Sequence, residues 1–209
     1  MPPKLKTEAE RQQVRALIID AARALFVSKG IEAVTMREIA KRINYSATSI
    51  YSHFSDKEEL LRAICDTDFL ALATNLKNLL QITNPIERLY ALGRGYAAFA
   101  LTHPNQYRMM FMTERTPWEP AESSLQQDNA EQDAYFQLKS VVKDVHAAGF
   151  FRADLQDADL IAQTIWAGMH GVCALQINMS EDKWIQWCEI SARLQLMQEV
   201  MMRGLLREK

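Results

Sequence analysis

Residues 35–60 constrain the fold of this chain more than any other segment, because they indicate two short helices joined by a tight turn. Thr35 and Glu38 form a T-x-x-E capping box, which predicts that a helix begins directly after Thr35. Asn44 follows that helix and tolerates left-handed backbone, so it can turn the chain, and Ser46 is placed to cap the next helix. Two short helices with a short turn between them have helix-turn-helix geometry, which we expect at about residues 34–53.

The second of these helices has an outer face without acidic side chains. Ile50 and Phe54 face inward, four positions apart, and the remaining positions are small, hydroxylated or aromatic: Ala47, Thr48, Ser49, Tyr51, Ser52 and His53. Small side chains allow close approach to a groove, and hydroxyls bond phosphates or base edges. The alternative from this pattern alone is an ordinary helical hairpin with a polar face. Ser55 and Glu58 form a further capping box and predict the start of a third helix.

The segment strongly resembles the N-terminal domain of TetR-family transcriptional regulators. The family pattern runs T-x-x-x-I-A-x-x-x-G-V-S-x-G-x-[LI]-Y-x-[HY]-F-x-x-K-x-x-L, and the chain matches it at Thr35, Ile39, Ala40, Ser46, Ile50, Tyr51, His53, Phe54, Lys57 and Leu60. The approach A-A-x-x-L-F-x-x-x-G matches at Ala21, Ala22, Leu25, Phe26 and Gly30. Asn44, Tyr45 and Thr48 depart from the usual Gly, Val and Gly, and these departures bear on the operator sequence. The resemblance implies a DNA-binding domain over residues 11–71.

Each expected DNA contact has a physical reason. Thr35 and Arg37 at one helix start, and Lys57 at another, are expected to bind phosphates with the free N–H groups there. Tyr51 and His53 are expected to clamp the backbone. We expect base-edge contacts from the second helix and its approach, at Tyr45, Ser46, Ala47, Thr48 and Ser49.

Composition predicts an all-α protein of about nine helices, which include one at about residues 125–148 after a loop at 113–124. The chain has 209 residues, 48% hydrophobic, with 7 Gly and 6 Pro, and apolar residues recur at helical rather than strand spacing. Residues 1–62 carry 11 Lys and Arg against 8 Asp and Glu, and residues 63–209 carry 13 against 18. A basic head on an acidic body fits nucleic-acid binding confined to the head. The family resemblance implies a three-helix DNA-binding domain followed by a larger helical domain at residues 72–209, which binds a ligand and dimerises.

The C-terminal part contains two adjacent apolar helices, expected at about residues 157–177 and 181–206. Residues 160–179 carry no formal charge, but polar residues within them and acidic flanks argue against a membrane span. A protein that reads DNA as a symmetric pair needs a dimer interface, and these helices are the candidate. The expected interface residues are Ala167, Gly171, Trp184, Trp187, Leu194, Met197 and Met201. The alternative is that both helices only close the monomer core.

A second resemblance links this part to the TetR C-terminal subgroup with a tryptophan-histidine-glycine signature, through Trp166, His170 and Gly171 and the run at residues 96–111. It implies a ligand-sensing, dimerising domain. Aromatic and methionine side chains give an adaptable apolar lining. The expected lining is Tyr96, Phe99, Tyr107, Phe111, Met112, Trp118, Trp166, Met169 and His170. Core packing is the alternative for each of them.

The sequence lacks the motifs of the common enzyme classes, including phosphate loops, G-x-S-x-G and H-E-x-x-H, so we expect no catalysis and no cofactor. The four His show no metal-ligand spacing, and the three Cys lie far apart, which is typical of reduced cytosolic thiols. We therefore expect a cytoplasmic homodimeric regulator, most simply a repressor, which binds an inverted repeat in double-stranded DNA and responds to an apolar or aromatic small molecule. A helical protein-interaction module and a redox- or metal-responsive regulator are the alternatives.

Overall fold

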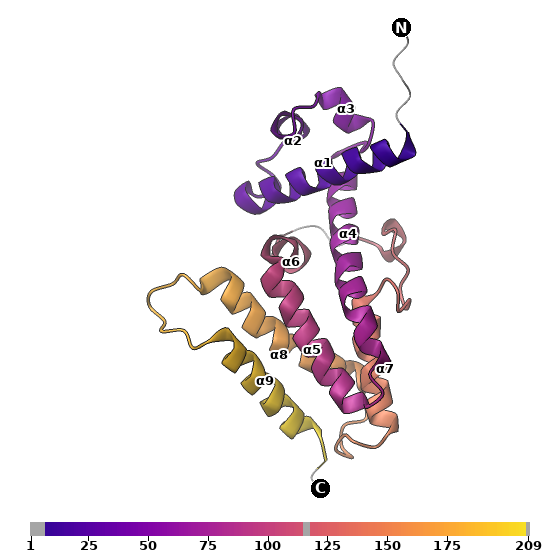
Figure 1. The fold of residues 1–209 in the computed structure, drawn as a ribbon, viewed down its shortest axis with the longest axis vertical. Coiled ribbons are helices and arrows are strands. Elements are labelled where there is room, and N and C mark those ends of the chain that lie inside the picture. The colour runs from indigo at the N-terminus through magenta and orange to yellow at the C-terminus, as the bar shows by residue number, and fades with distance from the viewer. Residues whose placement is uncertain (1–6, 115–117, 208–209) are drawn as a thin grey trace. The chain divides into compact units, whose positions relative to one another are not determined.

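The computed structural model describes residues 7–114 and 118–207 of the chain. Within these ranges there are nine α-helices and two short 3-10 helices, as the sequence predicted for an all-α protein (Figure 1). The α-helices are α1 (Glu8–Lys29), α2 (Met36–Arg42), α3 (Ala47–Tyr51), α4 (Lys57–Lys77), α5 (Pro85–Thr102), α6 (Pro104–Phe111), α7 (Ala134–Ala147), α8 (Ala158–Met179) and α9 (Ile190–Leu205). The 3-10 helices are η1 (Asn78–Gln81) and η2 (Pro120–Glu122).

The chain divides into two compact units, and one of the boundaries between them falls within α4. Unit 1 comprises residues 1–68 and 105–124, and unit 2 comprises residues 69–104 and 125–209. The sequence placed the boundary at residue 71, also within α4, but assigned everything after it to the C-terminal domain. The structure instead groups α6 and the segment after it with the head, because Met109 is fully buried in the hydrophobic core of unit 1.

The core of unit 1 is built from the inward faces of α1 to α4. Its fully buried side chains include Ile18, Phe26, Ile39, Ile50, Phe54, Leu60 and Ile64. A buried polar cluster connects three of its helices. The guanidinium of Arg23 on α1 donates two hydrogen bonds to the carboxylate of Asp68 on α4, with N–O distances of 2.9 and 2.6 Å. The side-chain amide of Gln106 on α6 donates to the same carboxylate at 2.9 Å. Bidentate geometry of this kind fixes the relative position of the helices that carry it.

The segment after α6 is held along α4. The indole N–H of Trp118 donates to the Glu58 carboxylate at 3.2 Å. Asp66 accepts from the Ser123 hydroxyl at 2.7 Å, and from the backbone N–H and hydroxyl of Ser124 at 2.7 and 2.6 Å. These contacts explain why a segment expected as a free loop belongs to unit 1.

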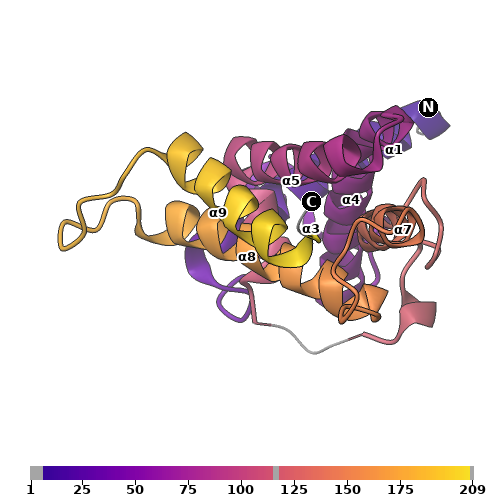
Figure 2. The same ribbon diagram turned by 90° about the horizontal axis from the view of Figure 1, so that it is seen from below.

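Unit 2 is a bundle of α5, α7, α8 and α9 with the second half of α4. Helix α5 contacts α7, α8 and α9, and α8 packs along α9, as two perpendicular views show (Figures 1 and 2). Among the described residues, α8 is the one helix whose length and composition would suffice to cross a membrane. Its inner face is buried in this bundle, at Ile161, Ile165, Met169 and Cys173.

Three predicted helix starts were wrong, and local hydrogen bonds explain each. The cap of α4 is Asp56 rather than Ser55, because the Asp56 carboxylate accepts from the Glu59 N–H at 2.7 Å, which lowers the pKa of Asp56. Helix α7 begins at residue 134 rather than 125, because Asp133 caps it by accepting from the Phe136 N–H at 2.9 Å.

The third difference is at α9, which begins at residue 190 rather than 181. Trp184 and Trp187 therefore lie in the loop of residues 180–189, not on a helix as expected. The Trp187 indole N–H donates to the carbonyl of Met179 at 2.9 Å, and the backbone N–H of Trp184 donates to the Asp182 carboxylate at 2.8 Å. These bonds stabilise the loop in place of the first turns of a helix.

Candidate nucleic-acid interface

The turn between α2 and α3 has the geometry that the sequence predicted. Asn44 has φ 57°, in the left-handed region that a short turn requires. The backbone N–H of Tyr45 donates a hydrogen bond to the carbonyl of Ala40 at 2.9 Å. Thr35 and Ser46 cap the two helices, since their hydroxyls accept from the N–H groups of Glu38 and Ser49 at 3.2 and 3.1 Å. Helix α3 is thereby fixed relative to α2.

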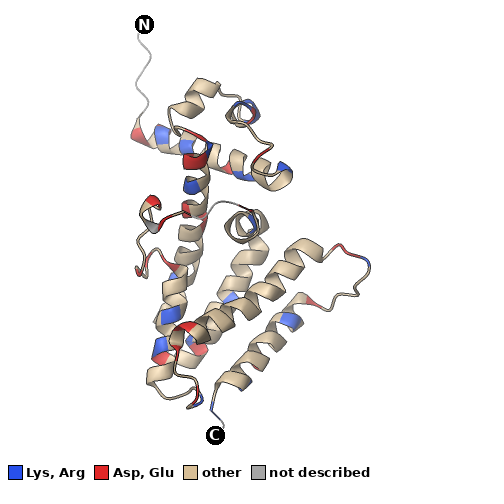
Figure 3. Cartoon of the chain, turned by 180° about the vertical axis from the view of Figure 1, so that it is seen from behind, with Lys and Arg blue, Asp and Glu red and all other residues tan. Residues whose placement is uncertain are grey.

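The two faces of α3 differ in the way a groove-reading helix requires. Ile50 is fully buried in the core of unit 1. Ser46, Thr48, Tyr51 and Ser52 are exposed, and the Tyr51 side chain is 53% exposed. Ala47, Ser49 and His53 are half-buried. No charged residue lies on α3 itself (Figure 3). Small and hydroxylated side chains therefore form its outer surface, free of the acidic groups that would repel DNA.

Three expected DNA contacts lie in more structured surroundings than the sequence suggested. Tyr45 is half-buried and packs against the core of unit 1, which places part of its ring away from solvent. The Lys57 ammonium donates to the carbonyl of Ile31 at 3.0 Å, so it also ties the start of α4 to the turn after α1. The carbonyl of His53 accepts from Arg15 at 2.9 Å, and the Arg15 guanidinium lies 4.1 Å from the centre of the Phe54 ring.

Helix α2 presents cations that the sequence patterns did not single out. Arg37 is exposed, as expected, and Lys41 and Arg42 in the last turn are exposed too. Lys41 lies one helical turn beyond Arg37, so both belong to one face. The four-residue spacing of Arg37 and Lys41 on the first helix of the motif is the sequence signal that would have identified Lys41 as a candidate phosphate contact. The Glu38 carboxylate on the same helix forms an ion pair with Lys29.

The expected ligand residues divide between the two units. Tyr107, Phe111, Met112 and Trp118 fall in unit 1, where Tyr107 is fully buried and its ring lies 5.0 Å from that of Phe111. Tyr96, Phe99, Trp166, Met169 and His170 fall in unit 2.

Three of the unit 2 residues form a polar chain between α5 and α8. The Trp166 indole N–H donates to the Tyr96 hydroxyl at 3.1 Å, and that hydroxyl lies 3.0 Å from Nδ1 of His170. The Tyr135 ring, on α7, lies 6.0 Å from the Trp166 ring. Burial lowers the pKa of His170. Unit 2 therefore gathers aromatic rings around the imidazole of His170.

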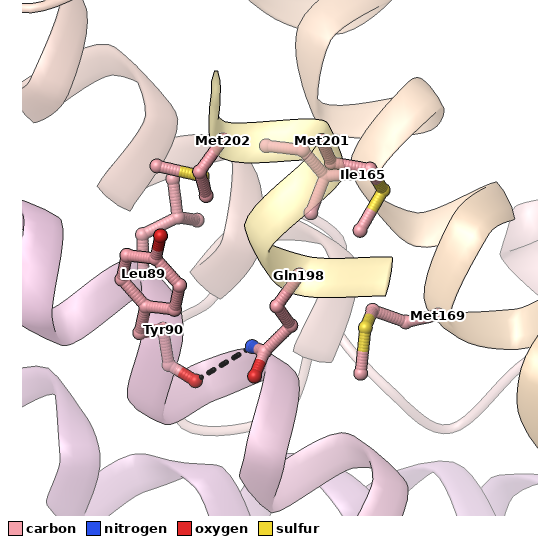
Figure 4. A pocket seen from close by; sticks show the side chains of 7 residues that line it. All are labelled: Leu89, Tyr90, Ile165, Met169, Gln198, Met201 and Met202. Carbon is pink, nitrogen blue, oxygen red and sulfur yellow. Dashed lines mark hydrogen bonds between the residues drawn. The ribbon is translucent and has the colours of Figure 1, made fainter. Parts of the chain in front are cut away.

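A small apolar recess lies nearby, where α9 meets α5 and α8 (Figure 4). Met169, Met201 and Met202 line it together with Leu89 and Ile165. The Gln198 side chain also lines it, is 8% exposed, and donates to the carbonyl of Tyr90 at 3.0 Å. This bond and the thioethers hold α9 against the bundle.

The expected dimer residues are placed on different surfaces. Ala167 is exposed, and a Cβ at Gly171 would meet nothing within 4 Å, so both face outward from α8. Met201 and Met197 instead turn inward, because a Cβ at Gly168 would lie 2.3 and 3.3 Å from their sulfur atoms. Leu194 is half-buried. The outward apolar residues of α9 are Leu196 and Val200, which are 61% and 59% exposed.

The residues that the structure describes give little support to a metal-binding or redox function. No group of three or more His, Cys, Asp or Glu residues there is placed to hold a metal ion. Cys65 and Cys173 are buried and Cys188 is exposed. Burial raises the pKa of Cys173 to about 11, which keeps its thiol protonated and unreactive near neutral pH.

Comparison with known proteins agrees with this geometry. Residues 18–64 match the family model described as bacterial regulatory proteins of the tetR family, and residues 89–182 match the tetracyclin repressor-like C-terminal domain. The transcriptional repressor KstR2 of Mycobacterium tuberculosis H37Rv is 29% identical over 155 residues, which span 72% of this chain and 75% of KstR2. The transcriptional regulator TtgR of Pseudomonas putida is 37% identical over 62 residues, 30% of each chain.

Solved structures share the fold over nearly the whole chain. The structure of KstR2 aligns with a TM-score of 0.64 at 22% identity, covering 97% of this chain and 98% of that one. SmeT, the repressor of a multidrug efflux pump of Stenotrophomonas maltophilia, aligns with a TM-score of 0.68 at 20% identity, covering 95% and 93%. These relatives are regulators of transcription rather than enzymes. With both halves of the fold matched by models of one family, the chain belongs to the TetR family of DNA-binding transcriptional regulators.

Proposed function

We propose that this regulator is a cytoplasmic homodimeric repressor, which binds an inverted-repeat operator and releases it when a small molecule binds in unit 2. The observation that carries the DNA-binding part is the uncharged outer face of α3, flanked by the exposed cations Arg37, Lys41 and Arg42 of α2. Cations at the flank neutralise phosphates while the small side chains approach base edges. Repression is supported by KstR2 and SmeT, which are both described as repressors.

The proposed dimer rests on the outward faces of α8 and α9. Leu160 and Leu175 on α8 are 58% and 45% exposed, and Leu196 and Val200 on α9 are more exposed still. Ala167 and Gly171 lie near the middle of α8, where small residues let a second helix approach closely. Exposed apolar residues on two adjacent helices are a surface that a symmetric partner would bury.

One variant tests dimerisation and operator binding together. Operator fragments are first selected from random DNA with the full-length protein, and an inverted repeat is expected. Val200→Glu should yield monomers in sedimentation velocity, keep the helical circular dichroism, and lose most affinity for the full operator. Lys143→Glu, on an exposed position of α7, is the matched control and should remain dimeric. A Val200→Glu protein that stays dimeric would place the interface elsewhere.

The proposed effector is an apolar or aromatic molecule with one polar group, bound beside Tyr96, Trp166 and His170. KstR2, whose solved structure is described as that of a ketosteroid transcriptional regulator, supports an apolar class. A panel of steroids, aromatic acids and hydrophobic dyes should contain a compound that quenches Trp166 emission and releases operator DNA at the same concentrations. Tyr96→Phe removes the hydroxyl that joins Trp166 to His170. It should weaken binding of this compound and leave the affinity for the operator unchanged. If operator affinity without compound falls as much as compound binding, the hydroxyl serves the fold and not the effector.

A further inference from the structure

The loop of residues 180–189, here called the tip loop, presents the most exposed apolar side chain among the described residues. The Trp184 side chain is 96% exposed. The loop extends beyond the ends of α8 and α9 in both views of the bundle (Figures 1 and 2). A fully solvated indole on a projecting loop is a frequent anchor of protein–protein interfaces.

The tip loop is ordered by contacts that leave Trp184 in solvent. The Asp182 N–H donates to the carbonyl of Met179 at 2.9 Å, and the Trp184 N–H donates to the Asp182 carboxylate at 2.8 Å. Trp187 is turned back onto its own chain, where the Arg193 guanidinium lies 4.8 Å from the centre of its ring. One tryptophan therefore braces the loop, while the indole of the other projects into solvent.

Charge along α9 points to the occupant. Its outward row runs at helical spacing from Glu189 through Ala192, Leu196 and Val200 to Arg203, and all five are exposed. A carboxylate thus stands at one end of an apolar row and a guanidinium at the other. Two copies packed antiparallel about the middle of this row would bring each Glu189 opposite Arg203 of the second copy. Parallel packing would place like charges together.

The small residues of α8 give the same crossing point. Ala167 and Gly171 lie on either side of the middle of α8, just as Leu196 and Val200 lie on either side of the middle of α9. Closest approach at both midpoints brings the tip loop of each copy to the opposite end of the other copy's helix pair. That end carries the exposed residues Phe150 and Arg207, joined where the Arg207 N–H donates to the Phe150 carbonyl at 2.9 Å.

We propose that the tip loop is a dimer arm: Trp184 of each copy docks on Phe150 and Arg207 of the second copy, and Glu189 pairs with Arg203. The contact joins an indole to a ring and a guanidinium. The loop carries Glu181, Asp182 and Glu189 against Lys183, so it is acidic. At the receiving end, Arg152 is paired with Asp154 and Asp157 caps α8, and the exposed Arg203 and Arg207 supply the cations that face the arm. The proposal rests on the dimer proposed above and specifies its arrangement.

Charge exchange in the full-length protein tests the arrangement. Glu189→Lys and Arg203→Glu should each raise the dimer dissociation constant about tenfold in sedimentation equilibrium, because the two-fold axis repeats every like-charge pair. The combined variant should return to within about threefold of wild type. Trp184→Ala should weaken the dimer about tenfold as well. The control is Glu87→Lys, an exposed first-turn glutamate of α5 that shares the helix-end position but not the surface.

The outcomes separate this inference from the dimer itself. Helix-end effects on folding would make Glu189→Lys and Arg203→Glu add in the combined variant, and additive weakening overturns the antiparallel pairing. If Glu189→Lys and Arg203→Glu each leave the dimer unchanged, parallel packing is indicated, because like charges would face each other both before and after either change, and the antiparallel pairing is again overturned. If wild type is a dimer that Val200→Glu dissociates but the tip-loop variants leave unchanged, only the arm is refuted. If wild type is monomeric, both proposals are refuted together.

Discussion

At the scale of single residues, the chain Trp166–Tyr96–His170 holds the imidazole in a partly buried polar contact between α5 and α8. An indole nitrogen is only a donor, so the Tyr96 oxygen accepts from Trp166. The same oxygen lies 3.0 Å from Nδ1 of His170, and a hydroxyl oxygen can accept two hydrogen bonds, so the contact fits either tautomer of the imidazole. Burial favours the neutral form of His170.

This arrangement predicts a pH dependence of stability. The pKa of His170 is lowered by burial, whereas in the unfolded chain it has the ordinary value of about 6.5. Between these two values the unfolded state binds more protons, so the free energy of unfolding falls as pH drops through 6.5. His170→Asn keeps a polar group near the Nδ1 position and removes the titration. Urea denaturation at pH 5.5 and 7.5 should show a smaller difference for this variant than for wild type; equal differences would contradict a lowered pKa of His170.

Single positions also show what residue patterns predict and what they miss. The cap at Thr35, the left-handed Asn44 and the buried Ile50 were predictable, because caps, turn residues and helical periodicity depend on near neighbours in the chain. The bond from Lys57 to the carbonyl of Ile31 was not, because it joins residues 26 positions apart. For the same reason the sequence could not show that Tyr45 packs on the core.

At the scale of helices, two glycines of α8 separate contacts within one copy from contacts between copies. A Cβ at Gly168 would lie 2.3 Å from the sulfur of Met201, whereas a Cβ at Gly171 would meet nothing within 4 Å. Gly171→Ala should therefore raise the free energy of unfolding of the protomer by about 0.5–1 kcal/mol through helix propensity, and yet weaken the dimer. Gly168→Ala should lower it by about 1–2 kcal/mol, because Met201 must move.

Urea denaturation in the monomeric Val200→Glu background measures the effect of each glycine variant on the free energy of unfolding of the protomer. Sedimentation of the single variants measures their effect on dimer dissociation. Equal effects of the two glycine variants on protomer stability would show that α9 does not pack on Gly168 as described. A Gly171→Ala protein with an unchanged dimer would mean that this face of α8 stays in water.

Helices were predictable in number and less so in extent. Composition and periodicity predicted about nine helices, and nine are found in the described ranges, but periodicity cannot tell where a polar loop rich in helix-forming residues stops being a helix. Residues 181–189 fit a helical pattern, and the structure uses the Trp187 indole to hold them as a loop. The expected ligand set was spread over both units for a related reason. Aromatic residues of α6 looked like a pocket lining, and the burial of Met109 and Tyr107 in unit 1 is a long-range property of the fold.

At the scale of the whole molecule, charge divides along the chain as the function requires. The first 62 residues carry a net charge of +3, from 11 Lys and Arg against 8 Asp and Glu, and the remainder carries −5, from 13 against 18. Helix α3 carries no charge and most of α8 and α9 is uncharged, while exposed cations gather on α2 (Figure 3). Electrostatic attraction to DNA should therefore come from the first 62 residues alone, and the remainder of the chain should repel the phosphate backbone of DNA.

Salt dependence of operator binding tests this division. Removing one cation that neutralises a phosphate lowers the slope of log affinity against log salt by about 0.9. Arg37→Ala should reduce the slope by about one unit on a half-site and about two on the full inverted repeat, because a dimer uses the residue twice. Arg37 is exposed, so its removal should leave the melting temperature unchanged, unlike that of Lys57, whose ammonium bonds Ile31.

Lys143→Ala, a matched removal of one exposed cation in unit 2, should alter neither slope. Titrations of fluorescent half-site and full-site DNA between 50 and 300 mM salt, roughly the range over which such slopes are linear, would measure both. Equal slope changes for Arg37→Ala on half and full sites would mean that only one head of the dimer contacts the operator, and a change for Lys143→Ala would mean that unit 2 contacts DNA as well.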